Sequence, residues 1–222
     1  MICGTKKKHV ESTSKVKHMT FKRVNSFVYL GALITTDNNT SSKINNRITL
    51  ANRSYFQLVN ILKAKSINRK YKMIIYKTLI KPVLMYGVDT WILSKADGLC
   101  LGVFERKILR IYGPICEGAI WRSRYNEELY HLYDETDLVS SIRITRLRWE
   151  GHIVQMQFNL PCNKITLDKT EGRRRVGRPN LRWMDGVTRD AERLGVRNWR
   201  IKAMDRDGWR QFLELAKTLH GL

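Results

Sequence analysis

The sequence has few of the features that place a protein in a membrane, at a metal ion or in an oxidising compartment. No apolar run approaches the roughly 20 residues that a helix needs to cross a bilayer, and no apolar stretch follows the basic N-terminus, so a secretory signal is not predicted. The cysteines are few and widely spaced, at Cys3, Cys100, Cys116 and Cys162. Because no two of them form a Cys-x-x-Cys pair, we expect reduced thiols in an intracellular protein and no zinc knuckle.

Acidic residues are scarce as well, above all in one segment. The 222 residues include 41 Lys and Arg against 20 Asp and Glu, a formal net charge of +21. Between positions 38 and 88 the chain has ten Lys and Arg and neither Asp nor Glu. A solvated surface normally mixes charges of both signs, so this segment predicts a basic surface, an anionic partner and salt-sensitive association.

The most basic stretch covers positions 172–183 and is called the arginine arm below. Its two glycines and Pro179 break regular helix, which predicts an extended or turning segment. Arginine presents a planar fork of donors that fits phosphate oxygens, and Trp183 can stack on a base. We therefore expect the arm to contact the backbone of RNA or DNA through its five arginines, which are Arg173, Arg174, Arg175, Arg178 and Arg182.

Three other interpretations of the arginine arm stay open. The same residues can serve as a nuclear localisation signal, or the arm can be a solvated linker whose charge only aids solubility. A minor-groove hook with an Arg-Gly-Arg-Pro core is the weakest of the three, because Val176 stands where that core needs its first arginine.

Hydrophobic spacing predicts a mainly α protein with a short β element near the N-terminus. Hydrophobic residues make up 43% of the chain, enough to bury a core. The apolar run 27–34 is bounded by turn residues and predicts one strand. Apolar periodicity and capping residues predict helices that begin after Ser41 or Ser42, after Ser66, at Pro82, near Leu101, at Asn126, at Asp137, near position 185 and near Asp205.

Some details of these helices can be predicted. The apolar side of the helix after Ser66 is expected to consist of Tyr71, Ile74, Ile75, Thr78 and Leu79, and that of the last helix of Trp209, Phe212, Leu213 and Ala216. Positions 157–184 are expected to form a loop.

His152 and Cys162 supply only two of the four ligands of a zinc site, so we expect His152 to pack beside Trp149 and predict no metal ion.

A series of short motifs resembles the C-terminal part of the reverse transcriptase of non-LTR (LINE-like) retrotransposons. One such motif alone is weak, whereas the series follows the order of that family along most of the chain. The motifs are Phe27-Val28-Tyr29-Leu30-Gly31, Ile44-Asn45-Asn46-Arg47-Ile48, Lys72 with Tyr76, Pro82-Val83-Leu84-Met85-Tyr86-Gly87 with Trp91, Arg146-Leu147-Arg148-Trp149-Glu150-Gly151-His152, Gly177-Arg178-Pro179 with Arg182-Trp183, and Asp205-Arg206-Asp207-Gly208-Trp209-Arg210. Two positions depart from the family, since Asp89 replaces its Glu and Gln155 its Arg.

The resemblance implies a division into three parts. Positions 1–36 correspond to the end of the polymerase palm, 37–115 to a helical, thumb-like domain, and 116–222 to a helical C-terminal region that carries the arginine arm. A thumb grips a primer–template duplex by its backbone. The resemblance therefore implies backbone contacts from basic side chains of its helices, with Lys43, Arg47, Lys63, Lys65, Lys72 and Lys77 as candidates. For each of these, a solvated outer helix face is the alternative.

The family's metal-binding aspartate motif is absent from the chain. The only acidic residues before Asp89 are Glu11 and Asp37, whereas two-metal polymerisation needs clustered carboxylates. We therefore expect a nuclear fragment that binds RNA or DNA without enzymatic activity, catalytic residues, cofactor or membrane partner. The palm of a parent polymerase is a further candidate partner. The alternatives are a domesticated nuclear DNA-binding or chromatin protein and an inert fragment.

Overall fold

The computed structural model describes residues 13–36, 39–167 and 182–218. Most of these residues are helical, which confirms the predicted mainly α class. The helices are α1 (Thr40–Gln57), α2 (Val59–Lys63), α3 (Arg69–Ile75), α4 (Lys81–Met85), α5 (Lys95–Leu109), α6 (Asn126–Tyr133), α7 (Leu138–Val154), α8 (Pro161–Leu167), α9 (Trp183–Arg193), α10 (Trp199–Met204) and α11 (Arg206–Thr218). A π-helical turn, η1 (Tyr76–Ile80), joins α3 to α4, and two 3₁₀ turns, η2 (Val88–Thr90) and η3 (Arg110–Tyr112), follow α4 and α5.

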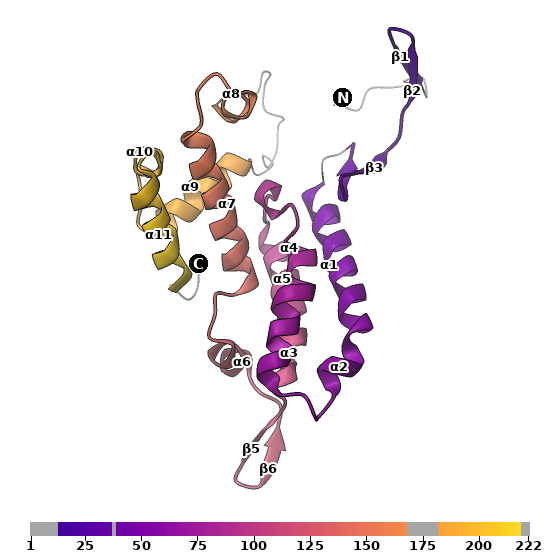
Figure 1. Cartoon of the computed structure of the whole chain (residues 1–222), viewed down its shortest axis with the longest axis vertical. Coiled ribbons are helices and arrows are strands. Elements are labelled where there is room, and N and C mark those ends of the chain that lie inside the picture. Colours follow the sequence, from indigo (N-terminus) through magenta and orange to yellow (C-terminus); the bar gives the residue numbers. More distant parts are fainter. Residues whose placement is uncertain (1–12, 37–38, 168–181, 219–222) are drawn as a thin grey trace.

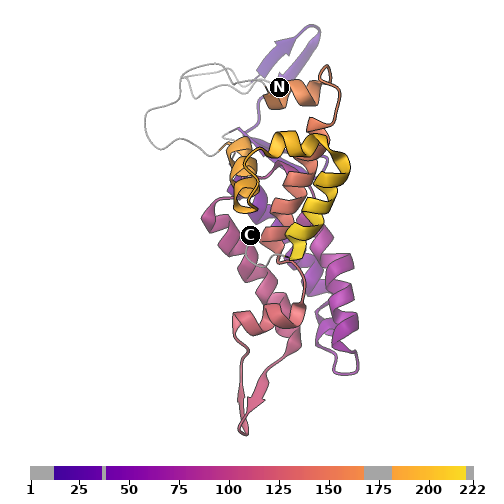
Figure 2. The ribbon, with the colours of Figure 1, turned by 90° about the vertical axis from the view of Figure 1, so that its left-hand side faces the viewer.

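The described strands pair as separate antiparallel hairpins. They are β1 (Thr13–Val16) with β2 (Met19–Lys22), β3 (Ser26–Tyr29) with β4 (Ala32–Thr35), and β5 (Ile115–Glu117) with β6 (Ile120–Arg122). The body is elongated, with α7 beside α9, α10 and α11 in one part and α1 to α5 in the other (Figure 1). Figure 2 shows that the β1–β2 and β5–β6 hairpins project from opposite ends of this body.

The apolar run 27–34 forms the β3–β4 hairpin and not the single strand that its composition predicts. Phe27 pairs with Ile34, and Leu30 and Gly31 turn the chain with φ angles of 46° and 75°. Two consecutive positive φ angles are typical of a type I′ turn, which glycine adopts without a steric penalty. Because the turn lacks an Asn-Gly or Asp-Gly pair, the sequence alone does not indicate it.

Two helices begin at an asparagine and not at the predicted serine. The side chain of Asn39 accepts a hydrogen bond from the backbone N–H of Ser42 at 3.4 Å, and caps α1. The side chain of Asn68 accepts one from Lys70 at 3.0 Å, and caps α3. Asparagine and serine are equally good capping residues, so local propensity does not choose between neighbouring candidates.

The apolar side predicted for the helix that begins at α3 was wrong except at Ile75, which is partly buried against the core. The buried residues are Met73, Tyr76, Ile80 and Leu84, whereas Tyr71, Ile74 and Leu79 are exposed. The π-helical turn between α3 and α4 contains more residues per turn than an α-helix, so a 3.6-residue periodicity does not follow its buried face. Pro82 lies in the first turn of α4, as predicted.

Buried apolar residues form two clusters that meet along α7. The first includes Ile44, Tyr76 and Leu101, and ends at Ile142. The second begins at Ile144 and gathers α9, α10 and α11 around the second half of α7. The predicted apolar side of the last helix is confirmed, because Trp209, Phe212, Leu213 and Ala216 are all buried. Helix α8 lies within the segment that was predicted to be a loop. Its seven residues are too few for a clear periodicity, so the sequence did not indicate it.

Candidate nucleic-acid interface

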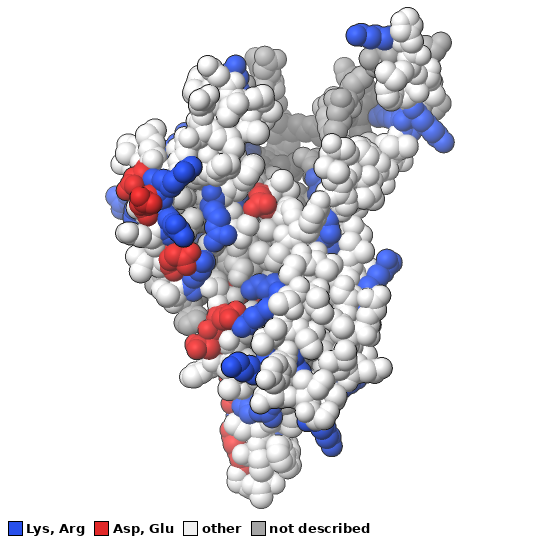
Figure 3. Space-filling model, in the orientation of Figure 1, with Lys and Arg blue, Asp and Glu red and all other residues white. Residues whose placement is uncertain are grey.

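One side of the described body is basic without acidic neighbours. In Figure 3 the charged side chains of the right-hand part, formed by β1 to β3, α1 and α2, are Lys and Arg, whereas acidic side chains lie toward α7 and α11 and down to the β5–β6 hairpin. The absence of Asp and Glu between positions 38 and 88 explains this asymmetry. Because a single sign of charge is presented there, the electrostatic potential over this side is positive.

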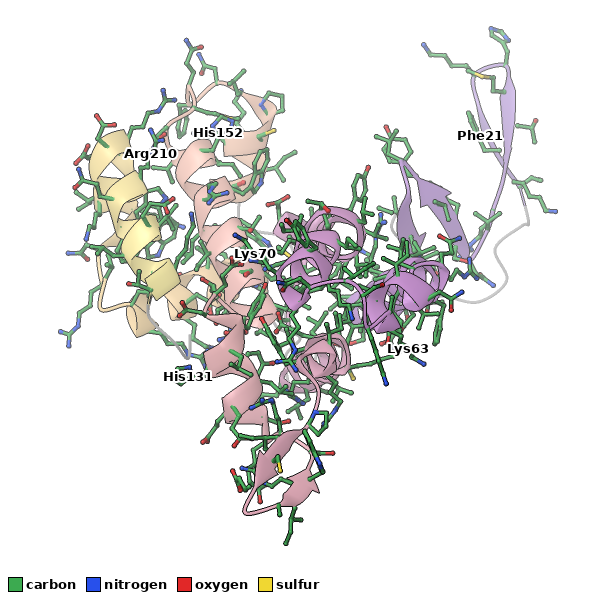
Figure 4. All side chains as sticks on the ribbon, turned by 60° about the horizontal axis from the view of Figure 1, so that its bottom comes forward. Phe21, Lys63, Lys70, His131, His152 and Arg210 are labelled. Atoms are coloured by element: carbon green, nitrogen blue, oxygen red, sulfur yellow. The ribbon has the colours of Figure 1, made fainter. Side chains whose placement is uncertain are left out.

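A group of exposed cations on this side lies where α2 ends and α3 begins. Lys63, Lys65, Arg69 and Lys70 are all exposed, and within the described part of the chain none of them forms an ion pair. We call these four residues the basic turn; two of them are labelled in Figure 4. The sequence predicted Lys63 and Lys65. It missed Arg69 and Lys70, although both lie in the same acid-free segment.

Arg47 belongs to a bridge between the β3–β4 hairpin and the helices. Its Nη2 donates a hydrogen bond to the carbonyl of Gly31 at 2.6 Å, and its guanidinium lies 4.4 Å from the centre of the Tyr86 ring. The Tyr86 hydroxyl in turn donates to the carbonyl of Leu30 at 2.5 Å. Any contact of Arg47 with phosphate therefore competes with this bridge.

The other predicted cations of the helices are less accessible than the basic turn. Lys72 is only 7% exposed. Lys77 forms an ion pair with Glu135, and its ammonium lies 5.6 Å from the centre of the Tyr133 ring. Lys43 is half-buried near the start of α1. The structure thus brings together Lys63 and Lys65, and places the remaining predicted lysines within or against the body.

The arginine arm falls largely outside the described residues. Arg173, Arg174, Arg175 and Arg178 belong to the part of the chain that is not described, whereas Arg182 is exposed at the N-cap of α9. The neighbouring Trp183 is half-buried, and its indole N–H donates to the carbonyl of Asp89 at 2.6 Å. This bond attaches the C-terminal end of the arm to η2.

A buried ion pair lies between α7 and α9, and its arginine also bonds to the other part of the body. Arg146 on α7 is 3% exposed and pairs with Asp190 on α9, while its Nη1 donates to the carbonyl of Trp91 at 3.1 Å. Gly186 makes room for the guanidinium, because a Cβ at that position would lie 3.0 Å from Nη1. The charge on Arg146 is therefore satisfied within the fold and is not part of the basic surface.

A second buried carboxylate lies inside the first core cluster. Glu105 is fully buried and accepts hydrogen bonds from the hydroxyls of Tyr76 and Tyr130, each at 3.3 Å, and from the backbone N–H of Leu138 at 2.9 Å. Burial raises the pKa of Glu105, and the hydrogen bond from Leu138 opposes that shift. This site is closed to solvent, so its hydrogen bonds connect α5 to η1, α6 and α7, and it offers no room for a substrate.

The described residues contain no group of three or more His, Cys, Asp or Glu that could hold a metal ion. His152 packs beside Trp149 as predicted, with the ring centres 5.5 Å apart. Among the same described residues, no helix is long and apolar enough to cross a membrane.

Comparison with known proteins identifies a distant relative. The chain is 24% identical over 197 residues to an uncharacterized transposon-derived protein of Caenorhabditis elegans. The aligned region covers 84% of this chain and 69% of the relative. No protein-family model matches the sequence, and no solved structure matches it. The chain therefore resembles a transposon-derived protein over most of its length.

Proposed function

We propose that this chain derives from the reverse transcriptase of a non-LTR retrotransposon, from the thumb and the C-terminal region that follow the catalytic palm. It binds the backbone of RNA or DNA and does not polymerise. The similarity to a transposon-derived protein supports the first part of this proposal. The exposed basic turn and the acid-free side of the body support the second part.

The observation that carries the proposed origin is that the sequence motifs contact one another in space. Arg47, in the motif at 44–48, donates a hydrogen bond to the carbonyl of Gly31, in the motif at 27–31. Arg146 bonds the carbonyl of Trp91, and the indole of Trp209 lies directly against Gly151. The first contact joins neighbouring motifs, whereas the other two join motifs that are far apart in the chain. Motifs that belong to one fold are expected to contact one another, so these contacts support the proposed origin.

The absence of polymerase activity is proposed from the sequence. The only acidic residues before Asp89 are Glu11 and Asp37, and two-metal phosphoryl transfer needs several carboxylates around the ions. Primer extension with the purified chain, Mg²⁺ and a primed RNA template tests this point. Extension products above those of a heat-treated sample would contradict it.

Binding is tested by fluorescence anisotropy with labelled duplex, RNA–DNA hybrid and single strands at several salt concentrations. If about six phosphates are contacted, the logarithm of the affinity should fall with the logarithm of the salt concentration with a slope of about −4 to −5. Similar affinity for unrelated sequences is expected, because backbone contacts carry no base information. A marked sequence preference would favour a domesticated DNA-binding protein, and no binding at low salt would favour an inert fragment.

The proposed origin also gives the N-terminal hairpins a partner. Val28, Tyr29 and Leu30 are 65%, 59% and 73% exposed, an unusual concentration of apolar surface on one short hairpin. We propose that the palm of the parent polymerase covers this surface.

The proposed location of the protein is the nucleus, with the arginine arm as the nuclear localisation signal.

A further inference from the structure

A groove of about 400 Å³ lies between α7 and α11. The two helices run antiparallel, because Thr136 before α7 bonds the carbonyl of Lys217 near the end of α11, and Gln155 after α7 bonds the carbonyl of Ala203 before α11. Arg148 and His152 line the groove from α7, and Arg206 and Arg210 line it from α11. Figure 4 shows His152 and Arg210 next to one another on the two helices.

The charge of this groove is positive and largely uncompensated. Arg148, Arg206 and Arg210 are exposed, and none of them forms an ion pair with another described residue. The carboxylate of the groove, that of Glu214, has both oxygens 2.6 Å from the ammonium of Lys217. Lys217 lowers the pKa of Glu214, and Arg148 and Arg210 add to that shift. The carboxylate is thus engaged by Lys217. Arg206 donates its Nε to Oε1 of Gln155 at 3.2 Å, so the terminal nitrogens of Arg206 and the guanidinium groups of Arg148 and Arg210 remain for a ligand.

The accessibility of the groove indicates a polyanion and not a single small anion. Exposed charge pairs contribute little individually in water, whereas a chain of phosphates engages several arginines at once and releases its counterions. Arg206 and Arg210 are one helical turn apart, about 6 Å along the axis, which is comparable to the separation of neighbouring phosphates on a strand. The groove therefore fits a nucleic-acid backbone.

An aromatic surface lies beside these arginines. Trp149 is 38% exposed, and its ring packs against that of His152, which lines the groove. Aromatic side chains beside a basic groove bind single strands by stacking on unpaired bases, which a duplex does not offer. The combination favours a single strand over a duplex.

We propose that this groove binds a single-stranded segment of RNA or DNA, with phosphates on Arg148, Arg206 and Arg210 and a base against Trp149 and His152. The inference rests on the proposed nucleic-acid binding and adds a second contact surface, separate from the basic turn. None of these five side chains is among the nucleic-acid contacts that the sequence predicted. The four residues that line the groove from the two helices belong to the motifs at 146–152 on α7 and at 205–210 at the start of α11.

Charge-removing variants test the phosphate contacts. The variant Arg148→Gln/Arg210→Gln should bind a labelled 20-nucleotide single strand about tenfold more weakly, and the salt slope should become shallower by about 1.4, two contacts at about 0.7 each. The matched control is Arg189→Gln/Arg197→Gln, which removes the same charge from exposed positions outside the groove. Equal losses in the two variants would overturn the proposal.

Variants of Trp149 test the stacking contact. Trp149→Ala should weaken single-strand binding by about 5- to 100-fold and leave duplex binding unchanged. Trp149→Phe, which keeps an aromatic ring and guards against a loss of folding, should retain most of the affinity. Equal effects of Trp149→Ala on single strands and duplex would overturn the stacking contact.

The outcomes separate this inference from the proposed function. If the groove variants bind like the wild type while substitutions in the basic turn weaken binding, the groove is rejected and the proposed function stands. If the wild type binds no nucleic acid, both are rejected. Co-sedimentation with phosphatidylserine vesicles that depends on Arg148 and Arg210, with unchanged oligonucleotide binding, would assign the groove to a membrane surface and would likewise reject the inference.

Discussion

The indole of Trp209 on α11 packs directly against the backbone of Gly151 on α7. A Cβ atom at position 151 would overlap Nε1 and Cδ1 of that ring, so only glycine permits this contact. Trp209 is 3% exposed and belongs to the second core cluster. Trp209 also lines the groove between the two helices.

Substitution of Gly151 should therefore destabilise the C-terminal half. Gly151→Ala forces α7 and α11 apart, and we expect a loss of about 1–3 kcal/mol in the free energy of unfolding. The control is Gly98→Ala on α5, where a Cβ would meet only Val139 at 3.9 Å. That variant should be neutral or stabilised by up to about 1 kcal/mol. Urea denaturation followed by circular dichroism measures both, and equal stability of the two variants would contradict the prediction.

The buried pair between Arg146 and Asp190 should show strong coupling. Arg146→Met leaves the carboxylate of Asp190 buried, with Arg143 at 3.7 Å as its remaining ion-pair partner, and should cost about 3–5 kcal/mol. Adding Asp190→Leu removes the uncompensated charge, so the double variant should recover part of that loss. A double-mutant cycle measures the coupling energy. Additive single effects would show that the pair is not coupled.

Glu150 should make stability depend on pH. It is 1% exposed, and its Oε2 has no hydrogen-bond partner within the described chain. Burial raises its pKa from 4.5 to about 7, with Arg200 opposing the shift. Because the folded state holds the proton more tightly than the unfolded state, the contribution of Glu150 to the free energy of unfolding is most favourable below about pH 4.5. It decreases as the pH rises through about 7, by about 3 kcal/mol in all.

Glu150→Gln should remove most of this dependence and stabilise the protein above pH 7. Urea denaturation at pH 5 and pH 8 gives the two free energies of unfolding. Glu105, whose pKa burial also raises, accounts for a remaining decrease with pH. Glu192→Gln on the exposed side of α9 is the control and should keep the wild-type pH dependence. The same pH dependence in the Glu150 and Glu192 variants would refute the assignment.

The basic turn should carry a measurable share of the salt dependence of binding. Replacing Lys63, Lys65, Arg69 and Lys70 by Gln removes as many as four phosphate contacts, so the salt slope should become shallower by about 3. All four side chains are exposed, so folding should be unaffected. Lys72→Gln is the contrasting single variant, since Lys72 is buried and its loss should change stability more than the salt slope. An unchanged slope in the fourfold variant would exclude the basic turn from the interface.

Several features were predictable because their signals are local. The apolar residues of α11 recur at helical spacing, and α6 begins at the predicted Asn126. The charge asymmetry of the body follows directly from the absence of Asp and Glu between positions 38 and 88. Helix periodicity failed at α3 and α4, where a π-helical turn moves the buried face onto Tyr76 and Ile80.

The sequence by itself determined the mainly α class, the net charge, the position of the basic segment and the order of the motifs, because these depend on composition and spacing. Only the tertiary structure decided which cations are available. It buried Lys72, paired Lys77 with Glu135 and used Arg47 to bridge Gly31 and Tyr86. It also brought Arg148 and Arg210 to one groove, which no spacing in the chain predicts, because their proximity arises from the antiparallel packing of α7 and α11 across Gly151 and Trp209.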